Sequence, residues 1–181
     1  MKKEKYSEKI EIPEGITCEI SDRTIICKKG DISIPLKITE KIVNIKIEDN
    51  YIVFETERFK KKEKKLIKTY VAHLKNNFKG LKEPFVYELE ACSVHFPITL
   101  KLEKNKLIIN NFLGEKKPRV ALIREGVDVK IQGQKVIVSS PNKEDAGQTA
   151  ANIEKATVVK NRDRRVFQDG IFIVSKPKGA R

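Results

Sequence analysis

Two short runs in the second half of the chain combine cationic side chains with a turn-forming residue and a single aromatic ring. They are residues 110–119 (NNFLGEKKPR) and residues 161–171 (NRDRRVFQDGI). Lys and Arg side chains bind phosphate groups, and the planar guanidinium of Arg can form two parallel hydrogen bonds with one phosphate. These runs therefore offer anion binding, and we expect the rest of the chain to be the scaffold that displays them.

The whole chain is strongly basic, with a formal net charge of +13 over 181 residues, which implies an anionic partner, most simply nucleic acid. Residues 160–181 alone hold seven cations and two anions. The seven cations are Lys160, Arg162, Arg164, Arg165, Lys176, Lys178 and Arg181. The last six residues cannot bury apolar surface, so we expect this tail either to order against a polyanion or to stay solvated and disordered.

The sequence lacks the signals that mark membrane proteins and secreted proteins. No apolar run approaches the roughly 20 residues of a membrane span, and residues 1–9 are charged, peripheral and without the apolar core of a signal peptide. We therefore expect a cytoplasmic protein. The widely spaced Cys18, Cys27 and Cys92 favour reduced structural thiols over a disulfide framework. Cys92 and His95 without a second ligand pair do not make a zinc site, so no metal is expected.

Catalytic signals are also missing. The sequence contains no phosphate-binding loop, no His-Glu-x-x-His and no Gly-x-Ser-x-Gly motif. We expect His73 and His95 to be structural, and Asp163 and Asp169 to orient neighbouring arginines or to cap turns. The sequence therefore predicts neither an enzyme nor a cofactor or small-molecule substrate.

Alternating apolar and polar residues predict two β-hairpins in the first half of the chain. One pairs residues 16–20 with 24–27, and the other pairs residues 43–47 with 51–54. Residues 31–38 between them read as a further strand, in which Pro35 favours an edge position.

The period then changes, because apolar residues between Phe59 and Phe78 recur at spacings of three and four, as on one face of an amphipathic helix. Gly80 stands where this helix is expected to end. The five lysines within residues 60–65 oppose the helix dipole, so this run either binds an external anion or is a solvated loop. A second helix is expected from Asn142, with an inward face of small residues that favours close packing on a sheet over contact with a sugar–phosphate backbone.

The second half repeats this plan. Residues 98–109 align with 16–27 at an offset of 82, and residues 127–138 align with 43–54 at an offset of 84. A helix follows each pair of hairpins. The repeat predicts an α+β fold with two duplicated domains, each an antiparallel β-sheet packed against one α-helix. The expected domains are residues 1–82 and 83–175, followed by a basic tail at 176–181.

Four runs give the chain a family resemblance. They are residues 93–98 (SVHFPI), 111–116 (NFLGEK), 145–153 (DAGQTAANI) and 163–171 (DRRVFQDGI). These runs resemble the universal large-subunit ribosomal protein number six, in its archaeal rather than its bacterial form. The resemblance covers the whole chain in order and is most specific over residues 111–174.

The resemblance implies binding to 23S-type large-subunit rRNA near the sarcin–ricin loop and the base of the acidic stalk, where translational GTPases dock. It also implies stabilisation of the rRNA fold, and neighbouring large-subunit proteins at the stalk base as partners. In this family the second domain and its tail make the principal rRNA contacts. Carried over to this sequence, the contacts are Lys116, Lys117, Arg119, Lys160, Arg162, Arg164, Arg165, Lys176, Lys178 and Arg181.

Four further residues are expected to shape the loops that carry these cations. Gly114 and Gly170 would permit the turns. Phe112 and Phe167 each have apolar neighbours, which favours a role as hydrophobic anchors of their loops over a role as platforms that stack on bases.

Two rival functions remain open at the level of sequence. A free-standing RNA chaperone or adaptor would use the same basic surfaces, but it would not run with large subunits at near one copy each. An RNA-modifying enzyme would need a pocket for a cofactor.

Overall fold

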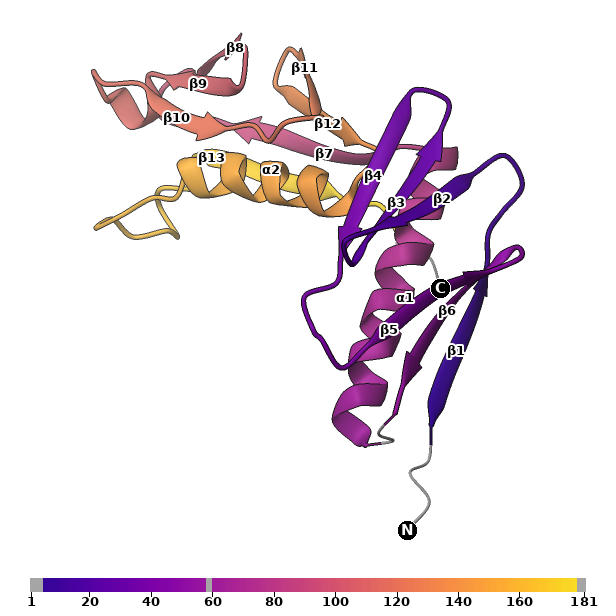
Figure 1. Ribbon diagram of the computed structural model, residues 1–181. Coiled ribbons are helices and arrows are strands. Elements are labelled where there is room, and N and C mark those ends of the chain that lie inside the picture. Colours follow the sequence, from indigo (N-terminus) through magenta and orange to yellow (C-terminus); the bar gives the residue numbers. More distant parts are fainter. Residues whose placement is uncertain (1–4, 58–59, 179–181) are drawn as a thin grey trace. The chain divides into compact units, whose positions relative to one another are not determined.

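The computed structural model describes residues 5–57 and 60–178 of the chain. These residues divide into two compact units, 5–83 and 84–178, and each unit has its own hydrophobic core. Each unit combines one α-helix with antiparallel strands (Figure 1), which confirms the predicted α+β fold of two duplicated parts. The strands of each unit are divided between two sheets.

In the first unit, the two sheets have the strand orders β1–β6–β5 and β2–β3–β4, and both contribute to one core with the helix. The elements are β1 (Tyr6–Glu11), β2 (Thr17–Ser21), β3 (Thr24–Lys29), β4 (Ile32–Lys37), β5 (Asn44–Glu48), β6 (Tyr51–Thr56) and α1 (Lys61–Lys82). Pro35 lies in β4 at the edge of its sheet, as predicted. Ile67, Leu74 and Phe78 are buried, which confirms the predicted inward face of α1.

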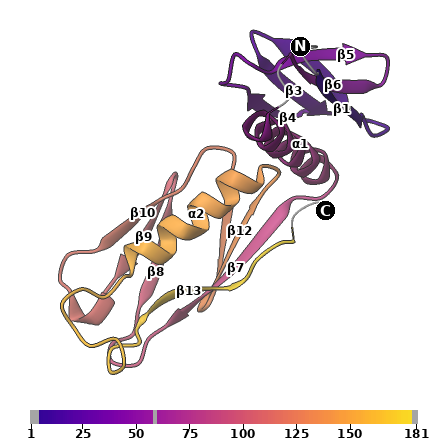
Figure 2. The ribbon, with the colours of Figure 1, turned by 90° about the horizontal axis from the view of Figure 1, so that it is seen from below.

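In the second unit, the sheets have the orders β10–β9–β8 and β11–β12–β7–β13. The elements are β7 (Phe85–Cys92), β8 (Thr99–Glu103), β9 (Lys106–Asn110), the 3₁₀ turn η1 (Phe112–Gly114), β10 (Arg119–Leu122), β11 (Asp128–Gln132), β12 (Lys135–Ser140), α2 (Lys143–Ala156) and β13 (Gly170–Ser175). Helix α2 contacts β7, β10, β12 and β13, and Figure 2 shows it lying across these strands.

The two units have matching topologies. The order β2–β3–β4 corresponds to β8–β9–β10, and β1–β6–β5 corresponds to β7–β12–β11. Thr17 and Thr99 begin equivalent strands at the predicted offset of 82, and Asn44 and Asp128 do so at the offset of 84. Among the described strands, β13 has no counterpart in the first unit, and it lies beside β7.

Two expectations about the first unit are wrong. Gly80 does not end α1, because the helix continues to Lys82 and the Glu83 amide donates to the Lys79 carbonyl at 2.9 Å. Leu81 is 4% exposed, and its burial outweighs the low helix propensity of glycine. The charged N-terminal segment is not wholly peripheral, because β1 begins at Tyr6 and pairs with β6.

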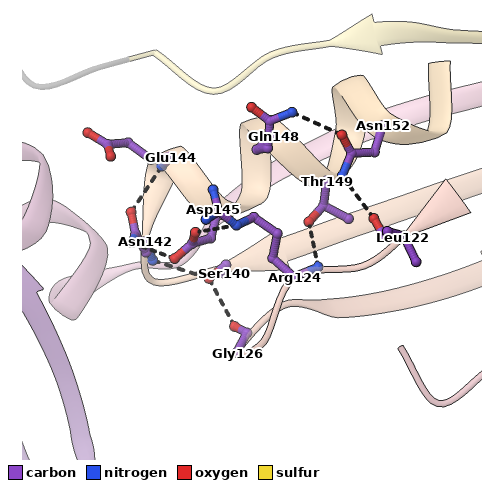
Figure 3. Close-up of polar contacts among 10 residues, drawn as sticks. All are labelled: Leu122, Arg124, Gly126, Ser140, Asn142, Glu144, Asp145, Gln148, Thr149 and Asn152. Atoms are coloured by element: carbon purple, nitrogen blue, oxygen red, sulfur yellow. Dashed lines mark hydrogen bonds and ion pairs between the residues drawn. The ribbon is translucent and has the colours of Figure 1, made fainter. Parts of the chain in front are cut away.

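Helix α2 begins as predicted at Asn142, whose side-chain oxygen accepts a hydrogen bond from the Glu144 amide at 3.0 Å (Figure 3). The Asn142 side-chain amide donates to Asp145 at 2.6 Å, and Arg124 pairs with the same carboxylate at 3.1 Å. The Arg124 amide in turn donates to Thr149 at 3.2 Å. These contacts fix the start of α2 against the segment that follows β10.

The small-residue face of α2 packs on the sheet, as predicted. Ala146, Ala150 and Ile153 are fully buried. A Cβ atom on Gly147 would lie 2.9 Å from the Tyr87 hydroxyl, so the glycine lets the helix approach β7 closely. Within the described residues, neither helix is long and apolar enough to cross a membrane.

Candidate nucleic-acid interface

Three loops of the second unit meet at one end of its sheets: residues 92–98, 111–118 and 157–169. We call this region the loop end. Figures 1 and 2 both show the second and third of these loops at the same end of α2. The loops are tied together by side chains that reach from one to the next, and these ties position the predicted cations.

Arg119 connects the second loop to the third. Its guanidinium pairs with Glu115 through hydrogen bonds of 2.8 and 2.6 Å, and it also donates to the carbonyls of Ala156 and Val158 at 3.0 and 2.9 Å. The same group lies 4.2 Å from the centre of the Phe112 ring. All three guanidinium nitrogens bind protein groups, so within the chain Arg119 acts as a clamp between the two loops. The RNA contact expected for Arg119 stays a prediction.

The second loop turns sharply around a buried anchor. Phe112 is 1% exposed and lies in the core of the unit. Gly114 has φ +76°, a conformation that favours glycine, and the Phe96 ring lies 3.4 Å from where its Cβ would be. Lys116 and Lys117 follow this turn and are exposed. The turn therefore presents two cations directly beside a fixed hydrophobic anchor.

The third loop is held by a turn at Asp163. Its carboxylate accepts a hydrogen bond from the Arg165 amide at 2.9 Å, and its carbonyl accepts one from the Phe167 amide at 2.9 Å. This is one of the two roles expected for Asp163. Arg164 is exposed, and the Arg165 side chain is 93% exposed. The backbone of the loop is thus fixed while the Arg164 and Arg165 side chains remain exposed.

Phe167 is half-buried, and its ring is occupied by other side chains of the protein. The Arg162 guanidinium lies 4.7 Å from the centre of the ring. The His95 ring stacks against it with centroids 4.9 Å apart. These contacts match the anchor role expected for Phe167 and leave Arg162 exposed on top of the anchor.

Asp169 is the buried tie between the first and third loops. It is 1% exposed and accepts hydrogen bonds from the amides of Val94 and His95 at 2.7 and 3.1 Å. Its other oxygen lies 2.6 Å from His95 Nδ1. Burial raises the pKa of the Asp169 carboxyl, but the hydrogen bonds from His95 and Val94 outweigh burial and hold the pKa below its ordinary value. Asp169 therefore neither orients an arginine nor caps a turn, and it fixes His95 instead.

Gly170 begins strand β13 and pairs with Cys92, so it does not form the expected turn. A Cβ at this position would lie 2.9 Å from the Phe172 ring, which folds over the glycine. The Phe172 ring thus packs directly over this glycine.

The structure brings together six of the ten predicted cations as exposed side chains of the loop end. They are Lys116, Lys117, Lys160, Arg162, Arg164 and Arg165. Lys176 and Lys178 are also exposed, but they follow the far end of β13, whose six residues span about 20 Å. Arg181 lies outside the described residues.

A pocket of about 630 Å³ opens beside the loop end. Arg164, Phe167 and Asp169 line it from the third loop, and Cys92 and Phe172 line it from the strands. Its wall combines apolar side chains with charged groups of both signs, among them Arg164 and Glu154. Within the described residues, no group of three or more acidic, His or Cys side chains could hold a metal ion.

Comparison with known proteins assigns the chain to one family. Residues 96–170, which carry the second and third loops, match the Ribosomal protein L6 family. The chain is 45% identical over 169 residues to the large ribosomal subunit protein uL6 of Methanococcus vannielii, covering 93% of each chain. It is 41% identical over 167 residues to uL6 of Methanosarcina mazei, covering 92% of this chain and 95% of the relative. The uL6 of Methanobrevibacter smithii is 41% identical over 169 residues, with 93% and 95% covered. The chain therefore belongs to the archaeal form of the uL6 family of large ribosomal subunit proteins.

Proposed function

We propose that this chain, a structural constituent of the large ribosomal subunit, binds 23S-type rRNA through the loop end and stabilises the rRNA fold. The observation that carries the proposal is the set of six exposed cations on the second and third loops, which are held in place through Arg119, Asp163 and Asp169. A fixed array of charges binds a folded polyanion with less loss of conformational entropy than a flexible one.

The position within the subunit is proposed from the family resemblance. The chain would lie near the sarcin–ricin loop and the base of the acidic stalk, beside neighbouring large-subunit proteins and close to the docking site of translational GTPases. It would act there in the cytoplasm without catalysis. The basic tail from Lys176 would make a second contact, separate from the loop end.

The contacts at the loop end suit recognition of RNA shape. Exposed Lys and Arg side chains neutralise phosphates, which supplies affinity without reading sequence. Phe112 and Phe167 are committed to the protein, the first by burial and the second by Arg162 and His95. Specificity would therefore come from how the rRNA backbone follows the three loops, with little stacking of bases.

Charge reversal at Arg164 and Arg165 tests this proposal. We expect Arg164→Glu plus Arg165→Glu to weaken binding to an rRNA fragment that contains the sarcin–ricin loop. The slope of log K against log salt concentration should fall in magnitude by about 1.5, because each phosphate contact contributes roughly 0.7–0.9. Binding that is unchanged at every salt concentration would contradict the assignment of the loop end.

A matched control carries the same change of charge at the β8–β9 turn. Lys104→Glu plus Lys106→Glu alters two exposed lysines of the second unit at the opposite end of β9 from the loop end. This variant should keep most of the affinity.

A sucrose gradient of the native chain then separates the rival functions. A ribosomal constituent stays with large subunits through high salt, at near one copy each. Ready loss at moderate salt would favour the free-standing RNA chaperone or adaptor.

A further inference from the structure

Cys18 and Cys27 face each other across the β2–β3 hairpin of the first unit. The hairpin turns through Asp22 and Arg23, whose φ angles of +45° and +64° are those of a type I′ turn. Such a two-residue turn closes on a hydrogen-bonded pair, here Ser21 with Thr24. Hydrogen-bonded and non-hydrogen-bonded pairs alternate along an antiparallel ladder, so the third pair beyond, Cys18 with Cys27, is non-hydrogen-bonded.

The side chains of a non-hydrogen-bonded pair lie closer together than those of a hydrogen-bonded pair. Cα atoms of a non-hydrogen-bonded pair are about 4.5 Å apart, within the range of about 4.4–6.8 Å that a disulfide spans. The two Sγ atoms of Cys18 and Cys27 are 3.5 Å apart. A disulfide would therefore require only small rotations of the side chains, with no shift of the strands.

The duplication supplies an internal comparison. At the offset of 82, the equivalents of Cys18 and Cys27 are Leu100 and Ile109, which are paired in the same register. Leu100 and Ile109 pack on the core of the second unit. An aliphatic pair can therefore fill this position of the hairpin. Packing does not require thiols here, so the thiol pair of the first unit adds chemical reactivity.

We propose that Cys18 and Cys27 form a dithiol site that small-molecule disulfides oxidise to an intramolecular disulfide. The Cys18 thiolate attacks one sulfur of the small disulfide and releases one thiolate. The Cys27 thiolate then attacks Cys18 Sγ in the mixed disulfide and releases the second. The two cysteines lose two electrons and two protons, and the small disulfide gains them as two thiols.

The two thiols are not equivalent, which fixes the order of attack. Cys18 is half-buried, and Cys27 is fully buried. The hydrogen bond between them lowers the pKa of Cys18 and raises the pKa of Cys27, which burial raises further. Cys18 is thus the accessible nucleophile, and Cys27 is the resolving thiol that acts once the mixed disulfide has formed.

The test treats the folded full-length chain, carrying Cys92→Ser to remove the exposed third thiol, with oxidised glutathione. We expect both remaining thiols to be lost, the mass to fall by two hydrogen atoms, and peptide mapping to join Cys18 to Cys27. Dithiothreitol should restore both thiols. A chain that keeps both thiols, or that carries glutathione without forming the crosslink, would overturn the proposal.

Single variants test the order of attack. With Cys27→Ser, glutathione should accumulate on Cys18, because no resolving thiol remains. With Cys18→Ser, the buried Cys27 should react many-fold more slowly, and equal rates in the two variants would contradict the assigned roles. Leu100→Cys plus Ile109→Cys in a cysteine-free chain tests the geometry, because the same register should close in the second unit.

Discussion

At the scale of single residues, the pair of Asp169 and His95 decides how the loop end responds to acid. The folded state holds the pKa of the Asp169 carboxyl below its ordinary value, so the folded chain keeps this carboxylate ionised at pH values where the unfolded chain protonates it. The unfolded state then binds more protons, and stability rises with pH in that window. The contribution is complete above about pH 4 and is lost as pH falls through the folded-state pKa.

Asp169→Asn should therefore lower the free energy of unfolding at neutral pH by about 2 kcal/mol, the size of a buried hydrogen bond to a charged group. The difference from the native chain should shrink as the pH falls below about 4, because the unfolded chain then protonates this carboxyl while the folded chain still holds it ionised. Urea unfolding at a series of pH values measures this difference. A difference that stays constant down to pH 2 would show that Asp169 acts only through packing.

Residue roles were only partly predictable from sequence. The exposed cations of residues 160–165 follow from composition, because a segment rich in Arg and Lys stays at the surface. The clamp role of Arg119 was not visible, because it depends on carbonyls of Ala156 and Val158, some 40 residues away in the chain. The partners of Asp169 are likewise 74 and 75 residues distant. Local patterns carry no information about such contacts.

At the scale of elements, the charges at the start of α1 are mostly unfavourable, with Glu63 as the one anion of its first turn. Lys60 occupies the N-cap position without a side-chain hydrogen bond, and Lys61 and Lys62 place cations at the positive end of the helix dipole. The last turn is favourable, because Lys79 and Lys82 lie at the negative end. Helix α1 is therefore held by its buried face rather than by its charges.

Lys61→Glu plus Lys62→Glu should raise the midpoint of thermal unfolding, since an anion in the first turn contributes about 0.3–1 kcal/mol at low ionic strength. Lys82→Glu, the matched change in the last turn, should lower the midpoint. Circular dichroism melts at low and at 1 M salt measure both effects, and high salt should erase them. The same sign of shift at both ends would exclude the dipole as the cause.

Most of the elements with a clear period were predicted, but two strands were missed. The hairpins and both helices appear where the alternation and the three-to-four spacing predict them. Strands β7 and β13 were not predicted, although β7 buries Phe85, Tyr87 and Leu89 in strict alternation. That alternation was a usable signal. The sequence of β13 contains the apolar run IFIV, which periodicity alone cannot assign to a strand or to a helix.

At the scale of the whole molecule, each of the two units is expected to fold on its own. Each has a core built from its own helix and strands, and the division falls between Glu83 and Pro84. The internal repeat made this organisation predictable, because a repeat of some 80 residues is long enough to enclose a core.

A fragment that begins at Pro84 should therefore fold alone and keep the salt dependence of rRNA binding through the loop end. A cooperative thermal transition by circular dichroism tests folding, and titration of the rRNA fragment tests binding. The Arg164→Glu plus Arg165→Glu change should have the same effect in the fragment as in the full chain. A fragment that melts without cooperativity would show that the second unit depends on the first.

The extra strand β13 makes the two halves differ in their capacity for unwanted association. In the second unit β13 covers the edge of β7, whereas no strand among the described residues covers the matching edge of β1. An open edge is a template on which another chain can add a strand. The sequence of β1, YSEKIE, places three charged side chains along that edge, and bringing these charges against a second chain is unfavourable. After duplication, one copy has thus blocked its edge with a strand, and the other has protected its edge with charge.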